Sequence, residues 1–112
     1  MTSATPEELL ETLEIHAVVQ RRNAGGAWVR GKVAGHQFSA LVFSEPADHP
    51  AWEVPGGSRI SKLWLRQIDD GTVVYSWDRG EDIGPRNELA AQIVDLLAVG
   101  LADLVWMTWK QN

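Results

Sequence analysis

The chain has 112 residues, no cysteine and a formal net charge of −5 at pH 7, with 15 acidic and 10 basic residues. This length predicts a single domain spanning residues 1–112. The absence of cysteine excludes disulfides, thiolate chemistry and cysteine-type zinc sites. The sequence suggests no apolar run as long as a membrane span and no basic-then-apolar leader, so we expect a cytoplasmic protein that does not bind membranes.

The charge is distributed unevenly along the chain. Residues 1–20 contain four acids and neither lysine nor arginine, whereas residues 21–66 contain seven bases and three acids. Residues 67–112 return to an acidic balance, with three bases and eight acids. The acidic total argues against a general nucleic-acid binder, which normally carries a basic footprint. The basic middle segment nevertheless leaves room for a local basic patch.

The first predicted element is a helix over about residues 6–21, within an N-terminal helical segment assigned to residues 1–22. Thr5 can cap this helix and Pro6 suits its first turn. Within residues 14–20, however, apolar side chains also alternate as they do in a strand. A short helix followed by an edge strand is therefore the alternative.

Residues 26–80 predict an antiparallel sheet that is interrupted by a long loop over residues 44–58. The strongest signal is a hairpin in which two runs rich in β-branched and aromatic residues are joined through Asp70-Gly71. An Asp-Gly pair favours a tight turn because glycine readily adopts positive φ. The sheet is expected to have four strands: Trp28–Ala34, Gln37–Phe43, Arg59–Gln67 and Thr72–Asp78.

A long C-terminal helix is predicted from about Pro85 to Trp109, within a segment assigned to residues 85–110, with Asp82 or Gly84 at its start. Its apolar stripe is wider than packing on one sheet face requires, so either the N-terminal helix or a second copy of the chain should cover the rest. Gly100, in mid-helix, predicts a close approach of another backbone. The residues expected to mediate self-association into a homodimer are Val99, Trp106 and Trp109.

These elements together predict an α+β fold. We expect a four-stranded antiparallel meander packed against the long C-terminal helix, with an additional N-terminal helix.

Alternation along the strands places aromatic and cationic side chains on one sheet face. Trp, Tyr and Arg are the residues that most often anchor protein interfaces, and six tryptophans is many for so short a chain. A partner-binding sheet face is therefore predicted, and Trp52 in the long loop is a second candidate contact. The residues of the predicted face are Trp28, Arg30, Lys32, Lys62, Trp64, Arg66, Tyr75 and Trp77.

Catalytic and metal-binding patterns are not recognisable in the sequence. His36 lies at a predicted strand turn without a second catalytic partner, and the spacing of Asp48, His49 and Glu53 matches no metal motif. No Ser/His/Asp set, phosphate-binding loop or pair of catalytic carboxylates occurs at a meaningful spacing. We therefore expect a protein that is not an enzyme and needs no metal or cofactor.

Several separated motifs carry a family resemblance: Trp28-Val29-x-Gly31, His36-x-Phe38-Ser39-Ala40-Leu41-Val42-Phe43, Gly57-Ser58-Arg59-Ile60-Ser61-Lys62-Leu63-Trp64-Leu65 and Val74-Tyr75-x-x-Asp78-Arg79-Gly80-x-Asp82. Over residues 28–85 the chain resembles a family of short proteins of unknown function encoded by bacteriophages and mobile elements. The resemblance brings no catalytic residue and no cofactor. It implies a mobile-element context and an accessory role, such as countering host defence or modulating a host complex.

The hypothesis that follows is a small, non-enzymatic protein-binding module that inhibits or modulates a host defence complex. The alternative is single-stranded nucleic-acid binding, in which bases would stack on the aromatic side chains of the same sheet face and phosphates would meet its cations. Self-association through the C-terminal helix is a further hypothesis.

Overall fold

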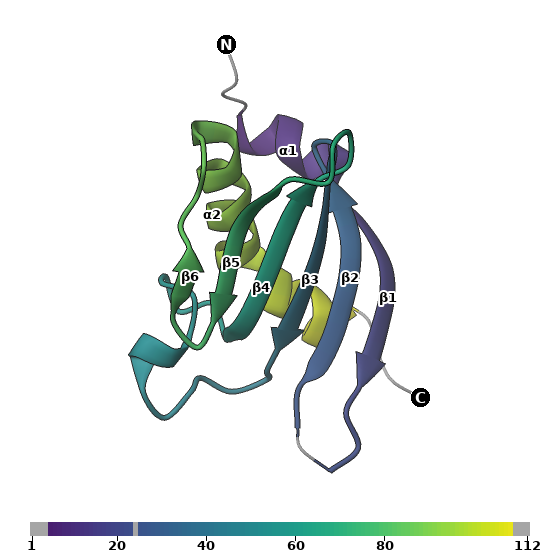
Figure 1. The fold of residues 1–112 in the computed structure, drawn as a ribbon. Coiled ribbons are helices and arrows are strands. Elements are labelled where there is room, and N and C mark those ends of the chain that lie inside the picture. Colours follow the sequence, from purple (N-terminus) through teal and green to yellow (C-terminus); the bar gives the residue numbers. More distant parts are fainter. Residues whose placement is uncertain (1–4, 24, 109–112) are drawn as a thin grey trace.

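The computed structural model describes residues 5–23 and 25–108. The fold is α+β, with an antiparallel sheet of six strands, a long helix on one face of the sheet and a short helix at one end (Figure 1). The strand order β1-β2-β3-β4-β5-β6 follows the chain, and every neighbouring pair is antiparallel. The predicted α+β class and antiparallel meander are confirmed, but the predicted strand number of four is wrong.

The four predicted strands occur within a residue or so of their expected limits. The two additional strands lie at the edges of the sheet, and each joins the meander through its neighbour in sequence. The strands are β1 (Glu14–Gln20), β2 (Ala27–Val33), β3 (His36–Val42), β4 (Ile60–Gln67), β5 (Val73–Asp78) and β6 (Glu81–Ile83).

The N-terminal helix, α1 (Pro6–Thr12), is much shorter than the predicted helix over residues 6–21. A capping box begins it: the backbone N–H of Glu8 donates to Thr5 Oγ1 (3.1 Å), and the Thr5 N–H donates to the Glu8 carboxylate (2.9 Å). The chain then pairs with β2 as β1, so the alternative of a short helix and an edge strand is the observed one. Strand pairing prevails because it lets Ile15 and Val18 pack against the core.

The C-terminal helix, α2 (Glu88–Asp103), begins later than predicted and continues into one π-helical segment, η2 (Leu104–Thr108). The Asn87 side chain caps it by accepting a hydrogen bond from the Ala90 N–H (2.8 Å). A start at Asp82 or Gly84 is wrong because residues 81–83 pair with β5 as β6. The predicted end at Trp109 lies outside the described residues.

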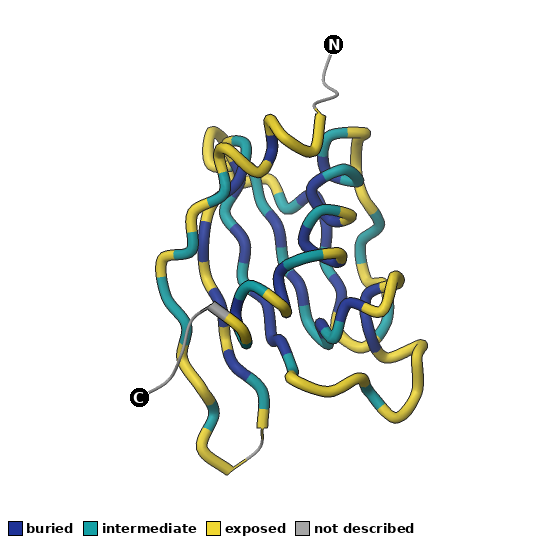
Figure 2. The backbone as a smooth tube through the Cα atoms, turned by 180° about the vertical axis from the view of Figure 1, so that it is seen from behind, coloured by how far each residue is buried: buried dark blue, intermediate teal, exposed yellow. Residues whose placement is uncertain are grey.

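The core lies between the sheet and α2, and Figure 2 shows buried positions along both. Leu9 of α1 and Val54 of the long loop also join this core. Burying an aliphatic or aromatic side chain of this size contributes about 1.5–3 kcal/mol, so the core determines which sheet face is covered. The largest fully buried side chains include Phe38, Ile60, Leu63, Leu65, Ile93, Leu97 and Leu101.

Gly100 lies in the middle of α2 without a close neighbour. A Cβ built there would have no other heavy atom within 4 Å, apart from atoms of its own helix and chain neighbours. Within the described chain no other backbone approaches Gly100, so an approach by a second copy stays a prediction.

The helical segment Glu88–Met107 is long and apolar enough to cross a membrane, judged by length and composition alone. The expectation that no stretch of the chain reaches this length is therefore wrong. A helix that packs one face into a protein core passes the same test, and α2 buries seven residues against the sheet and its neighbours.

Candidate functional site

The sheet face opposite α2 is the outer face, and no described helix or strand crosses it (Figure 1). The short helix α1 does not cover this face, because it packs against α2 and the end of β2 and buries Leu9 in the core. The side chains of the outer face on the three central strands are Trp28, Arg30, Lys32, Gln37, Ser39, Leu41, Lys62, Trp64 and Arg66.

Strand register brings these side chains together in rows. Directly opposed residues of an antiparallel pair lie on the same face. One row runs through Trp28, Leu41, Lys62 and Asp78, and the next through Arg30, Ser39, Trp64 and Ser76. Of the predicted partner-binding residues, Trp28, Arg30, Lys32, Lys62, Trp64 and Arg66 are thus neighbours on one open surface.

Tyr75 and Trp77 do not belong to that surface, and their predicted placement is wrong. Tyr75 lies opposite Leu65, and both are buried; Trp77 pairs in the same way with Leu63. A bulge between Leu65 and Arg66 causes the difference, because Arg66 pairs with Val73 and leaves the next residue of β5 unpaired. Since side chains alternate along a strand, one extra residue transfers every following side chain to the opposite face.

The cationic side chains of the outer face differ in the number of contacts that they make with neighbouring side chains. The Arg66 guanidinium lies 5.7 Å from the ring centroid of Trp64 and also donates to the side-chain oxygen of Gln37. Lys62 Nζ lies 3.6 Å from a carboxylate oxygen of Asp78. Among residues 5–23 and 25–108, the Arg30 side chain has no hydrogen bond or ion pair. The surface therefore offers both an ordered cation–aromatic pair and a guanidinium that is available to a ligand.

One carboxylate, that of Glu14, borders the outer face on the edge strand β1. His16 Nε2 lies 3.0 Å from it. The hydrogen bond from His16, followed by the positive charge of Lys32, lowers the pKa of Glu14 below its usual value. Glu14 and Asp78 thus lie at opposite ends of rows whose central side chains include the cations Lys32 and Lys62.

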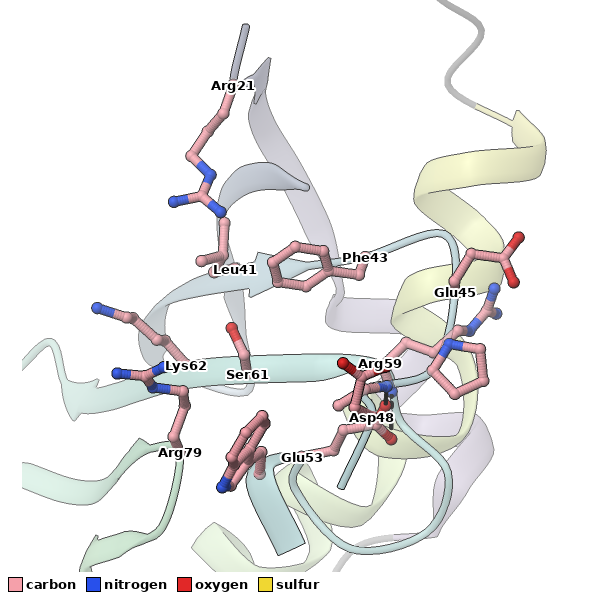
Figure 3. Close-up of a pocket in the computed structure, with 13 residues that line it drawn as sticks. Arg21, Leu41, Phe43, Glu45, Asp48, Glu53, Arg59, Ser61, Lys62 and Arg79 are labelled. Atoms are coloured by element: carbon pink, nitrogen blue, oxygen red, sulfur yellow. Dashed lines mark hydrogen bonds between the residues drawn. The ribbon is translucent and has the colours of Figure 1, made fainter. Parts of the chain in front are cut away.

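An open pocket of about 500 Å³ lies where the outer face meets the long loop between β3 and β4 (Figure 3). Arg21, Lys62 and Arg79 reach it from three different parts of the chain, with their nitrogen atoms on the same side in Figure 3. Leu41 and Lys62 belong both to the pocket and to the outer face, so the two sites are continuous. The other lining residues include Phe43, Glu45, Asp48, Trp52, Glu53 and Arg59.

Trp52, the predicted loop contact, lies at this pocket at the end of a short 3₁₀ helix, η1 (Pro50–Trp52). The residue remains 42% exposed, and its ring meets the ring of His49 edge to face, with centroids 4.3 Å apart. The Trp77 indole N–H donates to the Trp52 carbonyl (3.4 Å). The loop is thus attached to the sheet while the Trp52 ring stays accessible.

Glu53 holds the long loop in shape, a role that the sequence does not reveal. The residue is buried, and its two carboxylate oxygens accept hydrogen bonds from the backbone N–H groups of Ala47 and Arg59. Arg59 continues the connection, because it donates to the Ser44 carbonyl (3.1 Å) and pairs with Asp103 of α2. Within the described parts of the chain, no three His, Asp or Glu side chains are grouped to hold a metal ion.

His36 lies on the inner side of the sheet and reaches neither surface. Its side chain is buried, and Nδ1 is 2.7 Å from the Ala34 carbonyl. Nε2 is also buried and has no hydrogen-bond partner among the described residues. The arrangement places this histidine in the packing at the β2–β3 turn.

The described structure does not place the residues predicted to mediate self-association on one common surface. Val99 is 80% exposed on α2, whereas Trp106 is half-buried against the core and its indole N–H is buried without a partner in the described chain. Trp109 lies outside the described residues. An apolar pocket of about 330 Å³ between α1 and α2 adjoins Val99 and Leu96.

Comparison with known proteins identifies a family but no characterised relative. No curated protein and no solved structure matches the chain. A family model described as a domain of unknown function, DUF7678, matches residues 27–102, from the start of β2 almost to the end of α2. The match includes the outer face and the long loop, and it covers well over half of the chain. The protein therefore belongs to the DUF7678 family.

Proposed function

We propose that the protein is a non-enzymatic binding module that holds an acidic surface of a partner protein on its outer face. The observation that carries this proposal is the contrast between a chain of net charge −5 and an open sheet face whose centre is cationic and aromatic. Arg30, Lys32, Lys62 and Arg66 lie around Trp64 on this face, with Trp28 beside them.

The chemistry of these side chains suits a protein interface. Trp28 is 39% exposed, so its indole can lose further surface to a partner as an interface anchor does. Cations spread over a flat face attract and orient an acidic partner, and they favour it over other proteins. The stacked Arg66 side chain presents a largely preorganised contact, which lowers the entropy lost on binding.

The experiment is an affinity capture from lysate with the tagged protein and two double variants. Trp28→Ala with Arg30→Ala removes exposed outer-face side chains, while Glu88→Ala with Val99→Ala removes exposed side chains of α2. We expect the outer-face variant to lose the captured protein and the α2 variant to retain it. Circular dichroism and thermal unfolding of both variants provide the folding control.

The captured protein is then purified and titrated directly against the three chains at increasing salt concentration. An acidic partner bound through the outer face should dissociate more readily as salt screens the cations. Equal binding by the outer-face variant would contradict the proposal, as would a partner lost only from the α2 variant.

Single-stranded nucleic-acid binding is the second candidate, favoured by the presence of Trp28 and Trp64 among the cations of one sheet surface. Nuclease treatment of the lysate separates the two functions, because a protein partner would remain captured after digestion. Fluorescence anisotropy with labelled single-stranded DNA and RNA tests the alternative directly. Tight binding that is lost in the outer-face variant would replace the protein-binding proposal.

The proposed setting is the cytoplasm of a cell carrying a phage or mobile element, where the module would modulate a host defence complex. The support is the family resemblance of residues 28–85. Expressing the protein in a defended host should raise the plating efficiency of a restricted phage, and the outer-face variant should not. Equal plating with and without the protein would count against this setting.

A further inference from the structure

We propose that the pocket between the outer face and the long loop binds a nucleoside monophosphate. The pocket adjoins the outer face and shares Lys62 with it, but binding of a small molecule goes beyond the proposed protein-binding function. The inference rests on the volume of the pocket, on the distribution of charge around it and on the backbone conformation of Arg79.

The volume and the flat walls fit a ligand of this class. The pocket, at about 500 Å³, lies within the range of roughly 300–1,000 Å³ for small-molecule sites. Phe43 and Trp52 line it, and Trp52 is 42% exposed, so it is accessible to a ligand. Aromatic side chains of this kind stack on the face of a nucleobase.

The charges are separated across the pocket. Arg21, Lys62 and Arg79 lie on one side in Figure 3, whereas Glu45, Asp48 and Glu53 lie on the other together with Arg59, whose guanidinium pairs with Asp103. Guanidinium and ammonium groups suit a phosphate, and carboxylates accept hydrogen bonds from the N–H groups of a base. A nucleoside monophosphate carries a phosphate at one end and a base at the other.

Arg79 is the cation that points most clearly to a ligand. Its φ is +55°, a left-handed conformation that is costly for a residue with a long side chain such as arginine. The turn between β5 and β6 holds it there, with its N–H donating to the Ser61 carbonyl (2.9 Å). Within the described residues its guanidinium has no hydrogen bond or ion pair. Arg79 thus lines the pocket with a guanidinium whose N–H donors are open to a ligand within the described chain.

The other two cations support Arg79 but are already engaged. Arg21 donates through Nε to the Gly25 carbonyl (2.7 Å), and its guanidinium lies 5.7 Å from the Phe43 ring centroid. Lys62 lies 3.6 Å from Asp78. Both contribute positive potential at the phosphate side, while Arg79 supplies donors that have no partner among the described residues.

Isothermal titration calorimetry with adenosine monophosphate tests the proposal, with adenosine and inorganic phosphate titrated separately. We expect the monophosphate to bind at least about tenfold more tightly than either fragment, because only the whole ligand reaches both sides of the pocket. Arg79→Gly should weaken the binding of adenosine monophosphate by about tenfold or more, the effect of removing a charge-assisted contact.

Loss of binding in Arg79→Gly can be told apart from loss of folding. Glycine at position 79 relieves the left-handed strain, so this variant should have a higher Tm than the unmutated protein. Ala34→Gly is the matched backbone control, since Ala34 has φ +48° and does not line the pocket. Arg30→Ala is the charge control on the outer face. Both controls should bind adenosine monophosphate as the unmutated protein does.

Three results would overturn the proposal. The first is absence of any heat of binding with adenosine monophosphate. The second is unchanged affinity in Arg79→Gly, and the third is binding of inorganic phosphate as tightly as the monophosphate.

Discussion

Tyr75 lies directly opposite Leu65 in the β4–β5 pair, and both side chains are buried in the core beneath α2. Burial raises the pKa of Tyr75 from its ordinary value of 10.0 to about 12, and the negative charges of Glu81 and Asp95 act in the same direction. The two carboxylates lie on β6 and α2, so the pKa reports the packing of three elements around one phenol.

An ultraviolet absorbance titration can measure this relationship directly, because Tyr75 is the single tyrosine of the chain. We expect its phenol to ionise near pH 12 in the folded protein and near pH 10 in urea. The phenol of Tyr75 therefore stays protonated to a higher pH in the folded protein than in the unfolded chain. The resulting contribution to stability is therefore complete below pH 10 and is lost as the pH rises from 10 towards 12.

The control is circular dichroism recorded at each pH, since alkaline unfolding would release the phenol. Ionisation near pH 10 in a chain that is still folded would show that Tyr75 faces solvent rather than α2.

Gly31→Ala should destabilise the protein strongly. A Cβ at this position would lie 2.1 Å from the Glu14 carbonyl and 2.9 Å from the Phe38 ring, so both β1 and the ring must shift. Overpacking of this kind costs about 1–3 kcal/mol. Urea unfolding followed by fluorescence measures the loss, and an unchanged free energy of unfolding would mean that β1 does not lie against Gly31.

Gly100→Ala should act in the opposite direction. A Cβ at Gly100 enters open space, and alanine is favoured over glycine inside a helix by about 1 kcal/mol. We expect the free energy of unfolding to rise by about this amount in the same urea assay. A loss of stability would indicate that another chain packs closely on this turn of α2, which analytical ultracentrifugation of the unmutated protein would reveal.

Glu53→Ala should loosen the long loop and reduce stability by about 1–3 kcal/mol, because it leaves the N–H groups of Ala47 and Arg59 without their acceptor. Glu53→Gln is the matched comparison, since it retains one acceptor oxygen and should lose less. Hydrogen exchange at the two amides locates the effect. Equal protection of both amides in the unmutated and Glu53→Ala proteins would contradict the assigned role.

The sequence by itself determined the fold class and most of the element positions. Alternation along the central strands and the Asp70-Gly71 turn are local signals, because strand geometry and positive φ act within a few residues. The long apolar pattern of the C-terminal helix is local in the same sense. The outer-face positions of Trp28, Arg30 and Trp64 follow from these patterns.

Tertiary structure decided the features that depend on pairing between distant segments. Residues 14–20 suit either a helix or a strand, and pairing with β2 selects the strand. The bulge beside Arg66 turns Tyr75 and Trp77 away from the outer face, and no local pattern reports it because it is a property of the register between two strands. The pocket has the same origin: Arg21, Lys62 and Arg79 become neighbours only when the sheet forms.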